Sequence, residues 1–357
     1  MDARLGLLTD WVRVDLAMAG AAIEPASADA SFRRYFRIRH AGTTHVVMDA
    51  PPDKEDIRPF LRIAGMLAEV GVNAPRVEAA DLDRGLLLLS DLGSEQYLAT
   101  LEAARRAGDE TRIQTLYADA LAALVRIQHH GRGAAALLPD YDRPMLLREM
   151  ELLPEWFLSR HLGLVPDAGQ RRVLDDTFEA LIACALEQPV SFVHRDYHSR
   201  NLMVCAPGAP GILDFQDAVN GPITYDLVSL LKDCYISWPA ARVRQWALGH
   251  RAALLEAGLA AGNDAAQFLR WFDLMGLQRH IKVLGIFARL WYRDGKPGYL
   301  HDLPLVLRYT REAAAAYPAL AEFSAFLERE VAPRFEAAQT RALAAAGRTT
   351  GTAAGHS

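Results

Sequence analysis

Cysteine is scarce in this sequence of 357 residues, which contains only Cys184, Cys205 and Cys234. Their wide spacing forms no CxxC pair and no zinc-binding pattern. This scarcity excludes a disulfide-stapled scaffold and a zinc module, and it predicts a reduced chain that resides in the cytoplasm.

Long apolar runs are missing as well, because no stretch of about 18 consecutive apolar residues occurs in the sequence. The N-terminal apolar stretch is interrupted by Asp2, Asp10, Arg13 and Asp15, charges that a signal peptide does not tolerate. We therefore expect neither a membrane span nor secretion.

The chain also lacks a surplus of basic residues. Its 39 Lys and Arg residues face 44 Asp and Glu residues, for a net charge of −5. This balance argues against a nucleic-acid or anionic membrane partner, and no feature indicates an obligate protein partner. Hydrophobic residues make up 51% and charged residues 23%, as in an ordinary globular protein.

The hydrophobic pattern changes near residues 90–93, and this change predicts two lobes. Before it, alternating segments predict a hairpin over residues 31–48, turning at Ala41-Gly42, and further strands over 76–81 and 86–89. After it, helical periodicity dominates. We predict an α+β chain with a small β-rich N-terminal lobe over 1–93, a larger, mostly helical C-terminal lobe over 94–338, and a disordered tail over 339–357.

The most informative stretch is an apolar strand followed by His194-Arg195-Asp196 and then, five residues after Asp196, by Asn201. Two short strands later the chain reaches Asp214-Phe215. Phosphoryl transfer needs a carboxylate that orients the acceptor and oxygens that hold Mg²⁺ on the phosphates. Asp196 suits the first task, and Asn201 and Asp214 are hard oxygen ligands for magnesium. An isolated His-x-Asp pair is commonly a hydrogen-bonded loop, but the complete string indicates catalysis.

This string resembles the catalytic loop and metal-binding aspartate of the protein-kinase-like fold, in its aminoglycoside and choline phosphotransferase branch. The resemblance covers about residues 25–320 and implies a two-lobe kinase that uses ATP and Mg²⁺. It implies that Asp196 is the catalytic base, that His194 structures the loop, and that Asn201 and Asp214 hold Mg²⁺.

Other site residues are implied by the resemblance alone. Asp226 lies where this branch has an aspartate that supports the catalytic loop, although a helix N-cap is an alternative role. Residues 86–90 correspond to the inter-lobe hinge and residues 27–34 to the loop over the phosphates. The implied nucleotide-binding residues are Ser31, Arg33, Arg34, Ser90, Asp91 and Leu92. The implied acceptor-binding residues are His198, Arg200, Gln216, Asp217, Arg279, His280 and Lys282.

The N-terminal lobe departs from the wider kinase pattern. The nucleotide loop has no glycine, and the strand that should carry a phosphate-binding lysine reads Val46-Val47-Met48-Asp49. The following helix lacks the partner glutamate. Candidate replacements for the lysine, each of which could instead be a solvated cation, are Arg33, Arg34, Lys54 and Arg58. A non-catalytic nucleotide-binding protein therefore stays open as an alternative.

Residues 47–52, 214–233 and 278–290 are similar to the bacterial kinases that phosphorylate the anomeric hydroxyl of N-acetylmuramate and N-acetylglucosamine. That family salvages cell-wall sugars and also lacks an obvious strand lysine at this point. The resemblance implies transfer of the γ-phosphate of ATP to the sugar C1 hydroxyl, giving sugar 1-phosphates in peptidoglycan recycling. An aminoglycoside or other small-alcohol phosphotransferase, with an acid-lined acceptor pocket, is the alternative enzyme.

Charge offers a separate indication of the acceptor. Residues 238–300 contain nine basic and four acidic residues, a balance that suits an anionic lactyl group better than a polycationic aminoglycoside. Arg279, Lys282 and Arg289 share one helical face, which is the pattern of a binding stripe or of a solvated surface. The apolar spacing around His280 is typical of a core histidine.

Overall fold

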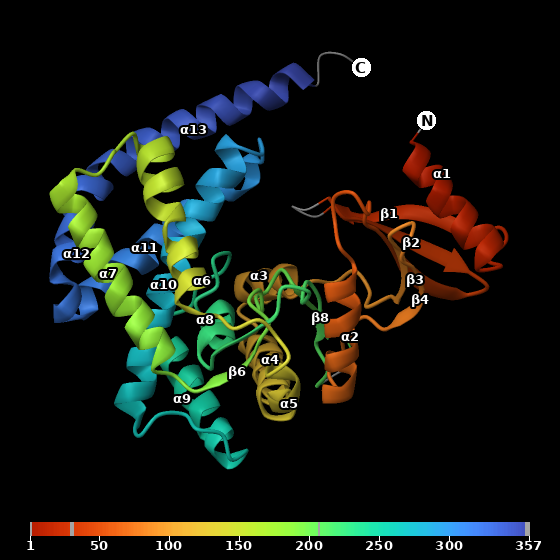
Figure 1. Cartoon of the computed structure of the whole chain (residues 1–357), viewed down its shortest axis with the longest axis horizontal. Helices are drawn as coiled ribbons and strands as arrows, with labels where there is room; N and C mark the ends of the chain where they lie inside the picture. Colours follow the sequence, from red (N-terminus) through yellow and green to blue (C-terminus); the bar gives the residue numbers. More distant parts are fainter. Residues whose placement is uncertain (1, 29–31, 206–207, 354–357) are drawn as a thin grey trace. The chain divides into compact units, whose positions relative to one another are not determined.

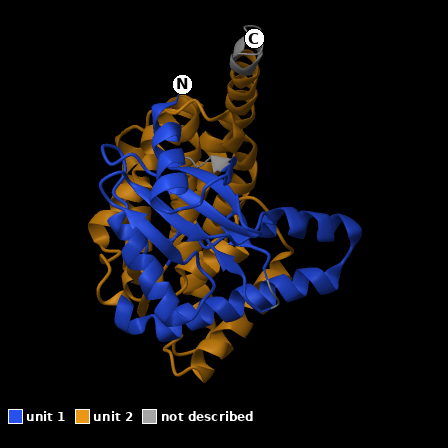
Figure 2. Cartoon of the chain, turned by 90° about the vertical axis from the view of Figure 1, so that its right-hand side faces the viewer, with its two compact units in different colours: residues 1–134, 194–218 blue, residues 135–193, 219–357 orange. Residues whose placement is uncertain are grey.

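The computed structural model describes residues 2–28, 32–205 and 208–353 and divides the chain into two compact units (Figures 1 and 2). Unit 1 comprises Met1–Ala134 and His194–Ala218, and unit 2 comprises Ala135–Val193 and Val219–Ser357. The chain thus leaves unit 1 and later returns to it for the segment that carries the predicted catalytic string.

An antiparallel sheet of five strands, ordered β1-β2-β3-β5-β4, forms the N-terminal part of unit 1. The predicted hairpin is confirmed as β2 and β3, and Ala41 (φ 48°) and Gly42 (φ 79°) make its left-handed turn. The two further strands that the sequence predicts are β4 and β5, whereas β1 was not predicted. The bounds are Ala22–Ala28 for β1, Arg34–His40 for β2, Thr43–Asp49 for β3, Val77–Asp81 for β4 and Leu86–Ser90 for β5.

One face of this sheet is covered by the N-terminal helix α1 (Ala3–Asp10) and the helical turn η1 (Trp11–Asp15). Phe36 and Ile38 of β2 belong to the same buried cluster as the helix residues. Alternate residues of a strand point to opposite faces. The even-numbered residues of β2 therefore face α1, and its odd-numbered residues face the other way.

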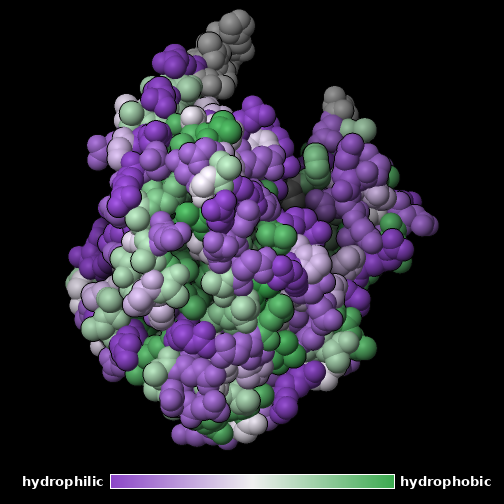
Figure 3. Space-filling view, turned by 60° about the vertical axis from the view of Figure 1, so that its left-hand side comes forward, coloured by the Kyte–Doolittle hydropathy of each residue, from purple (hydrophilic) through white to green (hydrophobic). Residues whose placement is uncertain are grey.

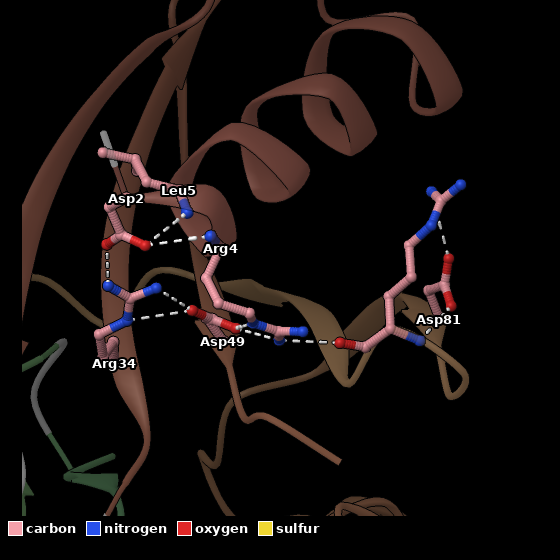
Figure 4. Close-up of polar contacts among 7 residues, drawn as sticks. Asp2, Arg4, Leu5, Arg34, Asp49 and Asp81 are labelled. Atoms are coloured by element: carbon pink, nitrogen blue, oxygen red, sulfur yellow. Dashed lines mark hydrogen bonds and ion pairs between the residues drawn. The ribbon is translucent and has the colours of Figure 1, made fainter. Parts of the chain in front are cut away.

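A charged network fastens α1 to the sheet (Figure 4). Asp49, at the end of β3, is fully buried, and the guanidinium groups of Arg4 and Arg34 each donate to its carboxylate from Nε at 3.0 Å and from Nη2. Arg34 also bonds Asp2, and Arg4 donates to the carbonyl oxygen of Arg84. A buried carboxylate needs such compensation, because an unpaired charge costs much free energy to bury.

Helices and a small hairpin complete unit 1. Helix α2 is followed by Gly71, whose φ of 77° makes a left-handed C-cap. The helices are α2 (Arg58–Val70), α3 (Tyr97–Ala107), α4 (Glu110–His130) and α5 (Arg132–Ala135), the last of which reaches the boundary with unit 2. The hairpin consists of β7 (Leu202–Met203) and β8 (Gly211–Ile212).

Unit 2 is built around the long helix α10 (Ala265–Tyr292), which contacts most of its other helices. At Gly285 the backbone of Leu152 approaches so closely that a Cβ atom would lie 2.4 Å from its carbonyl carbon. Two strands, β6 (Val190–Val193) and β9 (Val219–Pro222), pair in antiparallel fashion. The remaining elements are α6 (Arg143–Met150), η2 (Leu153–Leu162), α7 (Ala168–Leu186), α8 (Tyr225–Leu231), α9 (Ala240–Glu256), η3 (Pro297–Asp302), α11 (Leu303–Ala316), η4 (Pro318–Leu320), α12 (Ala321–Phe326), η5 (Leu327–Val331) and α13 (Ala332–Ala353).

The C-terminal segment differs from the disordered tail expected from residue 339. It belongs to α13, whose residues Ala338, Ala342 and Ala346 are buried at a spacing of four. Alanine has the highest helix propensity, and this spacing gives the helix one apolar stripe that packs on its neighbours. The alanine-rich composition of this segment therefore indicates a packed helix rather than disorder.

A sheet unit and a helical unit confirm the predicted α+β class.

Figure 3 shows hydrophilic residues over much of the face turned to the viewer, with smaller hydrophobic areas between them. Among the described residues, no helix combines the length and the apolar character needed to cross a bilayer.

Candidate active site

The loop that precedes β7 carries the catalytic string, and its first residue is a buried neutral histidine. Burial lowers the pKa of His194 to about 4, although the charge of Asp196 opposes this shift. The backbone N–H of Asp196 donates to Nδ1 of His194 at 3.2 Å. A neutral imidazole that accepts at Nδ1 fixes the backbone at Asp196, which fits the structuring role implied for His194.

Two helices of unit 1 hold the same loop. The hydroxyl of the fully buried Tyr197 donates to the carbonyl oxygen of Ala120 in α4 at 2.9 Å. The N–H of Leu98 in α3 donates to the carbonyl oxygen of Ser199 at 3.0 Å. The loop is therefore anchored to both helices, a role for Tyr197 that the sequence pattern did not reveal.

Asn201 joins the two predicted aspartates. Its side-chain Nδ2 donates to the carbonyl oxygen of Asp196 at 3.0 Å and to Oδ2 of Asp214 at 3.3 Å. The N–H of Leu213 donates to the carbonyl oxygen of Asn201 at 2.9 Å, which aligns the two segments. The structure thus brings Asp196, Asn201 and Asp214 together, as the sequence spacing predicts.

Backbone strain marks this site. Arg195 and Asp214 have φ values of 77° and 63°, in the left-handed region that residues other than glycine rarely occupy. Such strain costs about 1–3 kcal/mol per residue and persists only where the surrounding contacts enforce it. Both strained residues are either adjacent to or part of the predicted catalytic set, which is where stored strain is commonly found.

Asp214 and Asn201 fit a magnesium site. The Asp214 side chain is 31% exposed, so its carboxylate is accessible, and Gln216 Nε2 donates to its Oδ1 at 2.9 Å. Since Asn201 donates from nitrogen, its amide oxygen is the atom that suits a cation. No group of three His, Cys, Asp or Glu side chains in the described part of the chain could hold a metal. Mg²⁺ is commonly bound by one or two carboxylates and completed by substrate phosphates.

The aromatic residue after Asp214 is part of the core. Phe215 is fully buried, and its ring centroid lies 4.7 Å from that of Phe60 in α2. This contact connects α2 to the Asp214 segment. The sequence places Phe60 on the apolar stripe of α2 but does not show which partner it meets.

The residues predicted to bind nucleotide at the end of the hinge, Ser90, Asp91 and Leu92, are engaged in local bonds. Burial raises the pKa of Asp91, but hydrogen bonds from Arg37 and from the N–H of Gly93 outweigh it and hold the pKa below the ordinary value. Ser90 accepts from the N–H of Arg76 at 2.9 Å, and the carbonyl oxygen of Leu92 accepts from the thiol of Cys205. These contacts give the hinge a defined backbone.

The residues predicted for the phosphate loop do not share one environment. Ser31 lies outside the described residues. Arg33 lies with its Nη2 3.5 Å from Oδ1 of Asp214, whereas Arg34 pairs with Asp49 and Asp2 on the α1 side of the sheet.

Four of the predicted acceptor-binding residues lie in unit 1 with Asp214. His198 is buried, and the carbonyl oxygen of Arg200 accepts from Gln96 at 3.1 Å. Gln216 bonds Asp214, and its Nε2 lies 3.5 Å from Oδ2 of Asp217. His198, Arg200, Gln216 and Asp217 all belong to the segment of unit 1 that carries the predicted catalytic string.

The other three predicted acceptor residues lie in α10 and are buried in unit 2. Arg279 Nη1 lies 3.2 Å from Cys234 Sγ. Burial lowers the pKa of His280 to about 3, and its ring stacks on that of Tyr309 at 4.9 Å. Lys282 pairs with Glu149 at 3.0 Å.

Asp226 does not cap its helix. The N-cap of α8 is Thr224, and Asp226 lies in the first helical turn, where it is fully buried. The N-cap alternative is therefore wrong. The role of supporting the catalytic loop stays a prediction.

Comparisons with known proteins identify the class. Residues 22–272 match the model of the phosphotransferase enzyme family, so the chain belongs to that family and is a phosphotransferase enzyme. The fold agrees: an ethanolamine kinase from Plasmodium vivax aligns with a TM-score of 0.60 and 12% identity over 90% of each chain. The GDP complex of an aminoglycoside phosphotransferase aligns with a TM-score of 0.57 and 16% identity, covering 88% of this chain and 98% of the other. These likenesses confirm the predicted protein-kinase-like fold.

The curated relatives are more specific. The N-acetylmuramate/N-acetylglucosamine kinase of Pseudomonas aeruginosa is 48% identical over 311 residues, covering 86% of this chain and 88% of that protein. The proteins of the same name from Pseudomonas putida and Neisseria meningitidis are 45% and 41% identical, each over 90% of this chain and 95% and 94% of their own length. The family resemblance drawn from the sequence is confirmed.

Proposed function

We propose that this protein transfers the γ-phosphate of ATP to the anomeric hydroxyl of N-acetylmuramate and N-acetylglucosamine. The observation that carries the proposal is the 41–48% identity, over most of the chain, to kinases named for these two sugars. The products would be sugar 1-phosphates, formed in the cytoplasm during recycling of cell-wall sugars.

In this proposal Asp196 accepts the proton of the attacking hydroxyl. Its backbone N–H is bonded to His194 and its carbonyl oxygen to Asn201, so the backbone that carries the carboxylate is fixed on both sides. A positioned base is effective because it removes the proton as the new O–P bond forms. The anomeric hydroxyl is the most acidic hydroxyl of a reducing sugar, which makes it the easiest one for a carboxylate to activate.

Asp214 and Asn201 would hold Mg²⁺ beside the phosphates. When bound, the ion neutralises charge that develops on the β- and γ-phosphate oxygens. The contacts of Asp214 with Asn201 and Gln216 orient its carboxylate before any ligand arrives. Preorganisation of this kind lowers the cost of binding charged groups.

We propose His198, Arg200, Gln216 and Asp217 as acceptor-binding residues because they flank Asp196 and Asp214 on the same segment. Arg279, His280 and Lys282 are proposed as a second acceptor group, in α10. Asp226 is proposed to support the catalytic loop through its buried carboxylate.

The test is a coupled assay of ADP release with ATP and a panel of N-acetylmuramate, N-acetylglucosamine, aminoglycosides and choline. We expect turnover with the two amino sugars and a product that hydrolyses in mild acid, as a glycosyl phosphate does. The borohydride-reduced alditol of N-acetylglucosamine has no anomeric carbon and serves as the matched control.

The outcomes separate two parts of the proposal. Phosphorylation of the alditol at the rate of the sugar, or an acid-stable product, would reject the anomeric position while retaining the sugar kinase. Turnover confined to aminoglycosides or choline would reject the acceptor class.

A further inference from the structure

Binding of a nucleoside triphosphate needs positive charge next to the metal, because the phosphoryl group to be transferred carries negative charge on its oxygens. On the face of the sheet opposite α1, β3 carries Val46 and Met48, which lie across from Arg37 and Tyr35 of β2. Both are apolar, so the positive charge has to come from another residue. This inference rests on the proposed function.

Three of the four candidate cations are committed elsewhere. Arg34 pairs with Asp2 and Asp49 on the face covered by α1. Lys54 and Arg58 pair with the nearby acidic residues Asp53 and Asp56, and their side chains are 53% and 79% exposed. These contacts are local or structural, and none of them involves the catalytic segment.

Arg33 is different in burial and in contact. Its side chain is 11% exposed, and its Nη2 lies 3.5 Å from Oδ1 of Asp214. Arg33 immediately precedes β2 in the chain, and its guanidinium lies beside Asp214, whereas the guanidinium of Arg34 lies beside Asp49.

We propose that Arg33 is the phosphate-binding cation of this enzyme and takes the place of the missing strand lysine. If Asp214 holds the metal ion, phosphate oxygens that bind this ion would lie next to the Asp214 carboxylate, where the Arg33 guanidinium already lies. A guanidinium has five N–H donors in a planar fork, so it can bond a carboxylate and a phosphate oxygen together. Arg33 thus connects the nucleotide to the metal-binding residue.

The experiment compares nucleotide binding by wild type, Arg33→Met and Arg58→Met, measured by calorimetry with ATP, ADP and adenosine, with Mg²⁺ and with EDTA. We expect Arg33→Met to weaken ATP and ADP binding about 10- to 100-fold, the usual range for a charge-assisted hydrogen bond, both with and without metal. Adenosine has no phosphate, so its affinity should not change. Arg58→Met removes an equally charged residue of the same lobe and should bind all three ligands as wild type does.

Arg33→Lys keeps the charge and provides the second variant if Arg33→Met does not fold. It should retain the preference for ATP over adenosine to within about tenfold, because lysine binds phosphate as a point charge. Unchanged ATP affinity in Arg33→Met, or an equal loss for ATP and adenosine, would overturn the assignment, as would loss of that preference in a folded Arg33→Lys. Because the assay contains no acceptor, a protein that binds ATP but phosphorylates no amino sugar would reject the proposed function and leave the Arg33 assignment standing.

Discussion

The ammonium of Lys282 lies 3.0 Å from a carboxylate oxygen of Glu149, and each side chain is only 9% exposed. The hydroxyl of Tyr225 lies 3.0 Å from the same ammonium, and Tyr141 donates to the Glu149 carboxylate. Lys282 therefore carries a charge that is already compensated within unit 2. Breaking such a pair is costly because it leaves one buried charge alone.

Replacing only one partner of this pair should destabilise the protein. We expect Lys282→Met to lower the free energy of unfolding by about 3–5 kcal/mol, measured by urea denaturation. The double variant Lys282→Met, Glu149→Leu removes both charges and should recover most of that loss. Equal stability of the single and double variants would contradict the coupling.

The same variants test whether Lys282 binds the acceptor and distinguishes between the two sugars. If its ammonium binds the lactyl carboxylate, Lys282→Met should raise KM for N-acetylmuramate more than for N-acetylglucosamine, and the double variant should not restore it. A proportional effect on both sugars would assign Lys282 to the framework of unit 2.

Loss of the carboxylate proposed as the catalytic base should separate turnover from binding. Asp196→Asn keeps the shape of the side chain but removes the base, so we expect kcat to fall by about 10²–10⁴ while ATP affinity stays near that of wild type. The exposed Asp83→Asn in the turn between β4 and β5 is the matched control. A variant at Asp196 that keeps a third of the wild-type kcat would remove it from this role.

The metal prediction uses a substitution that respects the backbone. Asp214 has a φ of 63°, which asparagine tolerates better than alanine does. We expect Asp214→Asn to abolish the gain in ATP affinity that Mg²⁺ provides and to leave the affinity in EDTA largely unchanged. An unaltered Mg²⁺ titration would show that this carboxylate is not a ligand.

Two glycines of unit 2 should respond to alanine in opposite directions. At Gly285 the added methyl would meet the Leu152 backbone, so we expect Gly285→Ala to destabilise the protein by about 1–3 kcal/mol. Gly249, in α9, has no atom within 4 Å of the same position, and Gly249→Ala should stabilise by about 0.5–1 kcal/mol. Melting temperatures that move together would refute the close approach at Gly285.

Buried histidines should make the protein sensitive to acid. Burial alone lowers the pKa of His250 to about 3, and burial is also the main cause that lowers the pKa of His161 to about 4. Protons then bind the unfolded chain first, so stability is full above about pH 6.5 and is lost as the pH falls toward 4.

For one such histidine the loss at pH 5 is about 2 kcal/mol. Unfolding free energies of wild type and His250→Gln at pH 7.5 and 5.0 measure it, and the variant should lose less on acidification. An identical pH slope in both proteins would contradict a neutral buried His250.

The sequence predicted the elements whose signals are local. The hairpin of β2 and β3 alternates clearly, and its turn lies at Ala41-Gly42, where the sequence predicts it. Strand β1 was missed because Pro25 interrupts it and its register shifts near Ser27. Strand β9 was missed because Val219–Pro222 is short and becomes a strand only by pairing with β6.

The site likewise contains residues that local spacing predicts and contacts that it does not predict. Asp196, Asn201 and Asp214 were predicted because their spacing is typical of one loop followed by one strand end. The structure brings the three residues together. The pairing of Arg33 with Asp214 joins residues 181 positions apart along the chain, and no local pattern encodes it. Which of several arginines is neutralised, and by which carboxylate, depends on tertiary packing.

The discontinuous make-up of unit 1 has a consequence for biosynthesis. Its second segment, His194–Ala218, reaches the ribosome exit only after residues 135–193 of unit 2 have been translated. Until then the first segment lacks Tyr197 and Phe215, the buried aromatics that contact its helices α4 and α2. A nascent chain stalled at Ala134 should therefore remain open to proteolysis, and one stalled beyond Ala218 should gain protection. The enzyme would acquire the predicted catalytic string and its contacts with α4 and α2 in a single late folding step.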